Sequence, residues 1–190
     1  HCPVLFEDAD LLIINKPEGV LSHPNPGKQN PSCSFEGPYD LGERRFQTPA
    51  GPLWLIHRLD QDTSGVLLAA KNKKSAAACR AAFEKGLVKK NYLALVSRRP
   101  MPPHGKWRDA LIERRAGGGL RVAVHPSGRL NAFLNYKLKE YFQKLNLSLL
   151  EIELLTGKTH QIRVQAAYHG HPVAGDRVYG NFTLNKEVRE

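Results

Sequence analysis

The stretch LNLSLLEIELL (145–155) begins with leucines at alternate positions, separated by Asn146 and Ser148. Successive side chains of a β-strand point to opposite faces, so this alternation predicts a strand whose leucines at 145, 147 and 149 form one buried face. The preceding stretch FLNYKLKEYF (133–142) predicts a second long strand. A pair of long strands so close in sequence indicates a fold built on a β-sheet.

Further strands are predicted along the rest of the chain wherever short apolar runs are bounded by turn-forming residues. These strands cover residues 4–8, 11–16, 53–58, 65–71, 88–97, 107–112 and 120–124. Between them, the Pro- and Gly-rich stretch 17–52 predicts a long loop, which for a compact domain is either functional or mobile. Residues 171–180 predict a turn-rich tail.

Two segments predict helices. Residues 73–85 are rich in Ala, with Asn72 as the expected N-cap and Gly86 just after the end. Residues 159–169 predict a second helix that Gly170 ends. Because strands outnumber helices without regular alternation, the sequence predicts an α+β fold, with a mainly antiparallel mixed sheet and flanking helices and loops. A chain of 190 residues is expected to form one domain.

The charge of the chain is strongly basic, with 28 Lys and Arg against 18 Asp and Glu, a formal net charge of +10. Residues 71–99 alone carry nine basic side chains and one acidic one, Glu84, which gives +8 of that total. A concentrated positive charge indicates either a polyanion partner or a solvated surface, and charge alone leaves both open. No run is long enough to span a membrane, and three scattered cysteines favour reduced thiols in a cytoplasmic protein.

The stretch HRLDQDTSG (57–65) contains acidic and polar residues at a spacing that suggests a metal site. Asp60, Asp62, Ser64 and the following glycine match the first, third, fifth and sixth positions of a calcium loop, but the twelfth residue, where a bidentate Glu is needed, is Lys71. The calcium interpretation therefore fails. A polar turn between two strands remains, and so does an attacking carboxylate presented at a strand end beside the basic Arg58.

This stretch resembles the HRLD signature of the RluA-type family of RNA pseudouridine synthases. Three further stretches resemble family motifs in the same order: INKPEGVLSHP (14–24), KKNYLALV (89–96) and LLTGKTHQIRVQAAYHGHPVAGDRVYG (154–180). Together they cover most of the chain from residue 11 to 180. The resemblance implies the pseudouridine synthase catalytic fold and an isomerase that converts uridine in RNA to pseudouridine without cofactor or metal. The expected substrate is rRNA or tRNA.

Site residues follow from the same resemblance. Asp60 matches the catalytic nucleophile, Arg163 the arginine that pairs with it, and Tyr92 the tyrosine that stacks on the target base and transfers a proton. Arg58 matches the arginine that fills the base stack when the target nucleotide leaves it. The full set of expected RNA-binding residues is His57, Arg58, Arg44, Arg45, Lys89, Lys90, Lys158 and His160.

Two positions depart from the family pattern, namely Lys158, where Arg is usual, and Gln165, where His is usual. No S4-type RNA-binding domain precedes the motifs in this sequence, so RNA choice is expected to come from loops of the catalytic domain or from a partner. The expected protein is a cytoplasmic monomer with no membrane contact. The alternatives are a catalytically silent RNA-binding module of the same fold and a metal-dependent nuclease built on Asp60 and Asp62.

Overall fold

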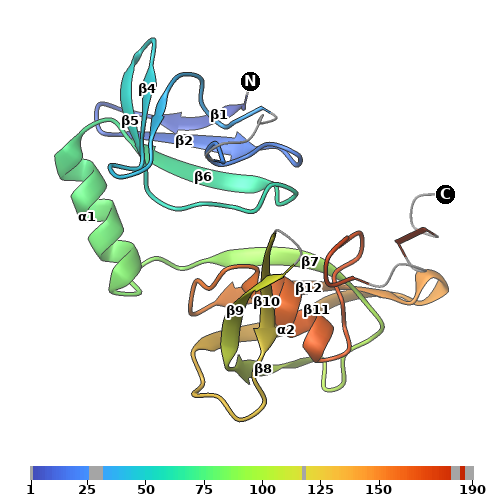
Figure 1. The fold of residues 1–190 in the computed structure, drawn as a ribbon. Helices are drawn as coiled ribbons and strands as arrows, with labels where there is room; N and C mark the ends of the chain where they lie inside the picture. The colour runs from blue at the N-terminus through green and yellow to red at the C-terminus, as the bar shows by residue number, and fades with distance from the viewer. Residues whose placement is uncertain (1, 26–31, 117–118, 181–184, 187–190) are drawn as a thin grey trace. The chain divides into compact units, whose positions relative to one another are not determined.

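The computed structural model shows a chain in which β-strands outnumber helices, with two α-helices among the residues described. The described residues are 2–25, 32–116, 119–180 and 185–186. The backbone gathers into two compact units, residues 1–87 and residues 88–190. Figure 1 shows the first unit in blue to green and the second in green to red. The prediction of one domain over residues 1–190 stays a prediction.

The first unit contains a six-stranded antiparallel sheet in the order β1-β2-β6-β5-β4-β3. Its strands are β1 (Val4–Glu7), β2 (Leu11–Lys16), β3 (Tyr39–Asp40), β4 (Arg45–Thr48), β5 (Gly51–Leu55) and β6 (Gly65–Ala70). One side of the sheet buries Phe46, Leu53 and Ala69 together. The central strands β5 and β6 are the two that enter and leave the HRLDQDTSG stretch, so this stretch is anchored in the middle of the sheet.

Helix α1 (Lys73–Glu84) confirms the first helix prediction. The Asn72 side chain accepts a hydrogen bond from the N–H of Ser75 at 2.9 Å, which satisfies a backbone donor at the helix start. Gly86 follows the helix with φ +68°, a conformation that favours glycine. The helix packs on the sheet through Ala76, which is buried against Trp54. None of the described helices is long and apolar enough to cross a membrane.

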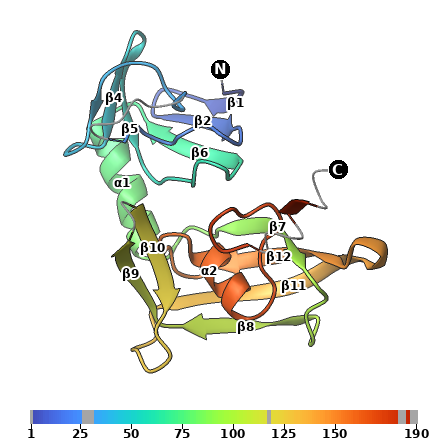
Figure 2. The same ribbon diagram turned by 45° about the vertical axis from the view of Figure 1, so that its right-hand side comes forward.

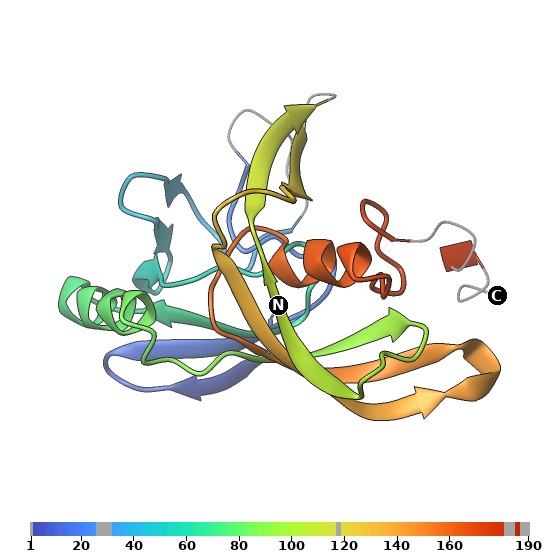
Figure 3. The ribbon, with the colours of Figure 1, turned by 90° about the horizontal axis from the view of Figure 1, so that it is seen from below.

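The second unit contains a four-stranded antiparallel sheet in the order β7-β12-β11-β8 and a separate hairpin of β9 and β10. Its elements are β7 (Asn91–Ser97), β8 (His104–Asp109), β9 (Leu111–Ala116), β10 (Gly119–Val124), β11 (Ala132–Phe142), the 3₁₀ helix η1 (Gln143–Leu145), β12 (Leu147–Leu154) and α2 (Gln161–Tyr168). Helix α2 packs on the sheet through Ala166 and against the hairpin through Val164. Figures 2 and 3 show α2 over one face of this sheet with the hairpin beside it.

The buried face that the first leucines predict for β12 is correct only in part. Leu147 is 1% exposed, as predicted, but Leu145 lies in η1 and is 60% exposed, and Ser148, predicted on the opposite face, is fully buried. The buried face is formed by Ser148, Leu150, Ile152 and, at the end of the strand, Leu154. The adjacent pair at 149 and 150 shifts the apolar alternation by one residue, and the longer second half determines which face packs against α2.

The prediction of a continuous loop over residues 17–52 is wrong in part, because β3, β4 and the start of β5 lie in it. These strands are very short and contain or adjoin prolines, so local propensity gives little signal for them. Tertiary packing stabilises them instead. Phe46 has no exposed surface and contacts Tyr39 with ring centroids 4.6 Å apart.

The single strand predicted over residues 107–112 is divided between two strands. Strand β8 ends at Asp109 in the four-stranded sheet, and β9 begins at Leu111 in the hairpin. Asn131 stabilises this change of direction, because its side chain accepts a hydrogen bond from the N–H of Leu111 at 2.9 Å and donates one to the carbonyl of Leu111 at 3.0 Å. Residues 107–112 (WRDALI) contain no Gly or Pro that would mark the division between the two sheets.

Candidate active site

Asp60 lies on the turn that joins β5 to β6. The turn is closed by a hydrogen bond from the N–H of Thr63 to the carbonyl of Asp60 at 3.1 Å. The preceding Leu59 is buried with 8% of its surface exposed, whereas the Asp60 side chain is half-buried. The turn therefore combines one apolar anchor with one carboxylate that remains partly accessible. Gly65, at φ +130°, allows the chain to enter β6.

Lys16, the last residue of β2, fixes this turn from the neighbouring strand. Its side chain is completely buried, and Nζ donates to the carbonyls of Pro17 at 2.8 Å, Val20 at 2.7 Å and Gln61 at 2.9 Å. An ammonium group has three donors, so this set satisfies it fully. Burial lowers the pKa of Lys16, and the charge of Asp60 is among those that oppose this shift. A cation is thus bonded to the residue that follows Asp60.

Ser22 fixes the other side of the same turn. Its hydroxyl accepts from the N–H of Leu59 at 2.9 Å and donates to the carbonyl of Leu59 at 2.7 Å. Gln61 adds a hydrogen bond from Nε2 to the carbonyl of Gly19 at 3.1 Å. The segment after β2 is therefore bonded to the residues on both sides of Asp60. This arrangement restricts the backbone of Asp60, as a precisely oriented nucleophile requires.

The other residues predicted near this turn differ in their surroundings. Arg58 is exposed, as a side chain that reaches into RNA must be. His57 accepts a hydrogen bond at Nε2 from the N–H of Leu68 at 3.2 Å, and its ring stacks on Phe83. Arg44 donates from Nη2 to the carbonyl of Ile56 at 3.0 Å. His57 and Arg44 therefore both help to shape the fold, and their contacts with RNA stay predictions.

In the second unit, α2 presents Arg163 to Asp176. The guanidinium donates from Nε to Oδ2 at 2.7 Å and from Nη2 to Oδ1 at 3.0 Å, a geometry that fixes its plane. Oδ1 also accepts from the N–H groups of Val178 at 2.8 Å and Tyr179 at 3.0 Å. Burial alone raises the pKa of Asp176, but the hydrogen bonds from Arg163, Tyr179 and Val178 lower it below the ordinary value. This carboxylate is therefore an ionised, buried support for Arg163.

Tyr179 completes the surroundings of Arg163. Its ring lies under the guanidinium carbon at 5.2 Å, within the range of a cation–π contact. Its hydroxyl oxygen accepts from the N–H of Val122 at 3.0 Å and lies 2.8 Å from Nδ1 of His160. His160 adopts φ +52° directly before α2, an uncommon conformation for a residue with a side chain. Through Tyr179, the β9–β10 hairpin and the tail (171–180) thus both contact the residues around Arg163 on α2.

The remaining predicted residues of this unit lie on β7 and before α2. Tyr92 is half-buried on β7, opposite Ile152, and packs against the core of the sheet. Lys90 is half-buried, and burial lowers its pKa. Lys89 and Lys158 are exposed, as expected of RNA contacts. Their contacts with RNA stay predictions, as does that of His160.

The predicted catalytic set is divided between the two units. Asp60 belongs to residues 1–87, and Tyr92 and Arg163 belong to residues 88–190. Their meeting in one site stays a prediction of the resemblance. Within the second unit, the carboxylate bonded to Arg163 is Asp176.

Gln165, which departs from the family pattern, is a core residue. It has no exposed surface, and its Nε2 donates to Oδ2 of Asp109 at 2.7 Å. The same oxygen lies 3.0 Å from Nε2 of His169, and the Oε1 of Gln165 accepts from Gln161 at 3.0 Å. The amide thus joins α2 to the end of β8. The structure gives Gln165 a role in the fold rather than at the surface.

The motifs predict no role for Lys16, Ser22, Asp176 or Tyr179, although all four residues lie within them. A lysine after an apolar strand is usually exposed, so its complete burial has no sequence signal. The signal for Asp176 and Tyr179 was their presence in the block that contains Arg163. Asp176 and Tyr179 contact Arg163 only because residues 171–180 fold back against α2.

Comparison with known families agrees with the motifs. The model of a family described as RNA pseudouridylate synthase matches residues 10–168. The chain therefore belongs to the RNA pseudouridylate synthase family, and the predicted resemblance is confirmed.

The relatives include both uncharacterized and named proteins. An uncharacterized RNA pseudouridine synthase of Bacillus subtilis (strain 168) is 37% identical over 187 residues, which cover 97% of this chain and 60% of that protein. Ribosomal large subunit pseudouridine synthase D of Xylella fastidiosa is 37% identical over 178 residues, which cover 93% of this chain and 51% of that protein. The chain thus spans between half and three fifths of the length of these relatives.

Solved structures agree on the fold. Human RNA pseudouridylate synthase domain containing 1 superposes with a TM-score of 0.74 at 22% identity, covering 98% of this chain and 73% of that one. Human RNA pseudouridylate synthase domain containing 4 gives a TM-score of 0.70 at 25% identity, with 95% and 69% covered. The predicted α+β fold of mainly antiparallel sheets is confirmed.

Proposed function

We propose that this chain isomerises uridine in RNA to pseudouridine, with Asp60 as the nucleophile. The observation that carries the proposal is that Asp60 lies inside the matched family region, on a turn held on both sides by Lys16 and Ser22. A surface turn would not need a buried ammonium group and a buried hydroxyl to fix its backbone. A nucleophile does, because catalysis requires a reacting group that is already oriented.

The reaction is an isomerisation, so no atom is gained or lost overall. The bond between N1 of uracil and C1′ of ribose breaks, the base turns, and a bond forms between C5 of uracil and C1′, while the hydrogen on C5 leaves as a proton and another proton binds N1. The Asp60 carboxylate acts either by adding to the ribose or by assisting elimination. The proposed role of Arg163 is to orient that carboxylate, and that of Tyr92 is to stack on the base and transfer the proton.

Large-subunit ribosomal RNA is the substrate that we propose first. Relatives that carry the name ribosomal large subunit pseudouridine synthase include type D in Xylella fastidiosa and type C in Haemophilus influenzae. Transfer RNA is the second candidate. We further propose that the protein acts as a monomer in the cytoplasm and requires neither metal nor cofactor.

The test uses large-subunit ribosomal RNA transcribed with uridine that carries tritium at C5. Since the new bond forms at C5, every pseudouridine releases one tritium to water. The chain should release tritium in the presence of a chelator, Asp60→Asn should release none, and Asp62→Asn, altered at an exposed position of the same turn, should retain activity. Equal release by the Asp60 variant contradicts the assignment. RNA binding without release by the unaltered chain, on both ribosomal and transfer RNA, supports the silent binding module instead.

A further inference from the structure

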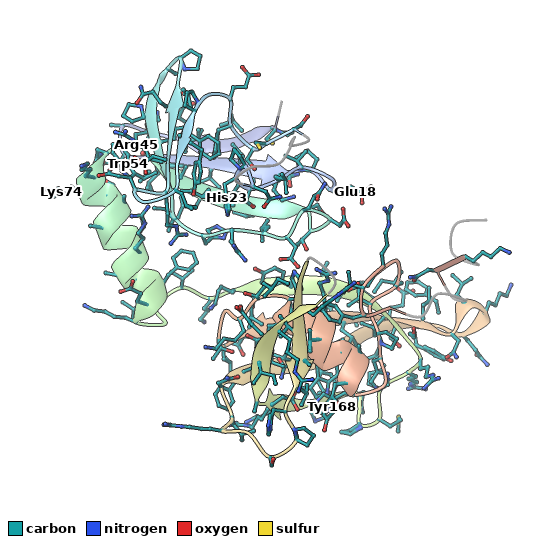
Figure 4. All side chains as sticks on the ribbon, viewed as in Figure 1. Glu18, His23, Arg45, Trp54, Lys74 and Tyr168 are labelled. Atoms are coloured by element: carbon teal, nitrogen blue, oxygen red, sulfur yellow. The ribbon has the colours of Figure 1, made fainter. Side chains whose placement is uncertain are left out.

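The hairpin of β9 and β10 carries two arginines directly opposite one another. Arg114 on β9 pairs in register with Arg121 on β10, so both side chains leave the same face of the hairpin. Both are exposed, and among the residues that the structure describes neither guanidinium has a hydrogen bond or an ion pair. Figure 4 shows the side chains of the described part of both strands. Like charges directly opposite in a strand pair are destabilising, so the fold itself gives no reason for this arginine pair.

The other face of the hairpin is anchored to the rest of the second unit. Val122 is buried there in a cluster with Val164 of α2, and its N–H donates to the hydroxyl of Tyr179 at 3.0 Å. The hydrogen bonds between Asn131 and the backbone of Leu111 fix the start of β9. Figure 3 shows the hairpin standing clear of the four-stranded sheet. The arginine pair therefore lies on the exposed face of a ribbon whose opposite face is fixed to the unit.

The hairpin supplies no carboxylate that could neutralise the arginine pair. Glu113 is the only acidic residue in 111–124, and the alternation of the strand places its side chain on the opposite face from the two arginines. There its Oε1 accepts from the hydroxyl of Thr159 at 2.9 Å. The neighbours on the arginine face are Ile112 and Ala123, which pair in register and have apolar side chains. The two cations thus share a face on which the described residues of the hairpin offer no anion.

A phosphate of the RNA backbone matches this arrangement. A phosphodiester carries one negative charge on two non-bridging oxygens, so each guanidinium can donate to one of them. Such hydrogen bonds are charge-assisted, and the phosphate charge between the guanidinium groups would relieve their repulsion. We propose that Arg114 and Arg121 together bind one phosphate of the RNA substrate. The proposal rests on the proposed action on RNA for the identity of the polyanion, and it adds two residues outside the four motifs to the RNA-binding set.

The first experiment gives one arginine of the pair a partner within the protein. In Arg121→Glu the new carboxylate lies directly opposite Arg114, an arrangement that stabilises a strand pair and occupies the remaining guanidinium. The midpoint of urea denaturation should therefore rise. The affinity for a large-subunit ribosomal RNA transcript, measured by filter binding, should fall about tenfold because the phosphate loses both donors. A pair that only solvates the surface predicts the rise without the fall, so an unchanged affinity would overturn the proposal.

Lys144→Glu is the matched control, because it changes the net charge of the protein by the same amount. Lys144 is exposed on η1 and is separated from the hairpin by the 11 residues of β11, a length of roughly 35 Å. The control should change the affinity for the same RNA far less than Arg121→Glu does. Equal losses for the two variants would show that affinity follows net charge alone, and they would refute a phosphate site on the hairpin.

A second experiment determines whether the two arginines share one phosphate. Arg114→Gln, Arg121→Gln and the double variant are titrated with the same RNA at several salt concentrations. A shared phosphate predicts that the double variant reduces the slope of log binding constant against log salt concentration by about 1, and that the two single losses of affinity do not add. A reduction by about 2 with additive losses would give each arginine its own phosphate and overturn the shared site. Binding is measured without isomerisation, so a chain that binds RNA through this pair but releases no tritium fails only the proposed activity.

Discussion

Nζ of Lys16 lies 2.9 Å from the carbonyl oxygen of Gln61, although the two residues are 45 positions apart in the chain. This contact joins the end of β2 to the residue after Asp60. A surface lysine would contribute little to stability, since exposed charges are well solvated. Here the charge is enclosed by backbone carbonyls, so the fold depends on the lysine and the lysine determines the course of the turn.

Replacing Lys16 by Met should both destabilise the protein and abolish isomerisation. The variant leaves three carbonyl acceptors without their donor, and we expect the free energy of unfolding to fall by about 3 kcal/mol. Urea denaturation measures this. Lys139→Met, which removes only a surface ion pair with Glu151, is the control and should change stability by less than about 0.5 kcal/mol. Similar losses for both variants would contradict the proposed role of Lys16.

Ser22→Ala should lower the rate of isomerisation clearly, while the protein stays folded and loses only part of its free energy of unfolding. The variant removes the hydroxyl that both accepts from and donates to the backbone of Leu59, which leaves Asp60 less well oriented. We expect a loss of about 1–2 kcal/mol in the free energy of unfolding. Ser34→Ala provides the comparison, because Ser34 is also buried but donates to Leu21 instead. Single-turnover rates on the same RNA should fall for Ser22→Ala and stay near the original value for Ser34→Ala.

Asp176→Asn should weaken the pH dependence of stability at acid pH. The folded-state pKa of Asp176 is lowered, so its contribution is complete above the unfolded value of about 3.9 and is lost as the pH falls through the lower folded value. Near pH 7 we expect the variant to be less stable by about 2 kcal/mol. The difference from the unaltered chain should shrink as the pH falls below about 4. A difference that stays constant from pH 7 to pH 2.5 would show that ionisation of Asp176 is irrelevant.

Two replacements of Tyr179 should separate its ring from its hydroxyl. Tyr179→Phe keeps the ring under Arg163 but removes the acceptor for the N–H of Val122, whereas Tyr179→Leu removes both features. If the ring orients Arg163, the rate of isomerisation should fall several-fold further for the leucine variant than for the phenylalanine variant. Similar rates for the two variants would assign the role to the hydroxyl and its contact with His160.

Lys89→Gln should weaken RNA binding without changing stability. Lys89 is exposed, so its expected partner is a phosphate, and losing one such contact should reduce the slope of log binding constant against log salt concentration by about 1. Lys71→Gln is the contrasting variant, because Lys71 is bonded to Glu7 at 2.6 Å within the protein. The salt dependence should be nearly unchanged for Lys71→Gln. Filter-binding titrations at several salt concentrations distinguish the two.

Local signals in the sequence predicted the elements that depend on local chemistry. Helix α1 was predicted with its cap because Asn72 and Gly86 satisfy the helix ends by short-range contacts. Strands β3 and β4 were missed because their stability comes from Phe46, whose burial depends on distant residues. The predicted buried face of β12 is correct for Leu147 but not for Leu145, because the apolar alternation shifts by one residue along the strand and packing against α2 selects the second register.

In the candidate site, too, some residues are predicted from the sequence and others are not. The motifs predict Asp60, Tyr92 and Arg163 as the catalytic residues, because each occupies a recognisable position in motifs that follow one another in a fixed order. The groups that hold them were invisible, since a buried lysine and a serine bonded to a backbone look like ordinary loop residues in a sequence. Asp176 lies 13 residues from Arg163, beyond the end of α2, and their pairing depends on how the tail folds back.

The hydrogen bonds of Lys16 and Ser22 also determine what can be transplanted. Nine consecutive residues would look like a portable cassette, to be inserted between two strands of another scaffold. Their geometry, however, depends on a lysine and a serine supplied by a segment about 40 positions earlier. A chimera that receives HRLDQDTSG alone would gain the carboxylate and lose its orientation. Two separate pieces of chain must travel together for the graft to be active.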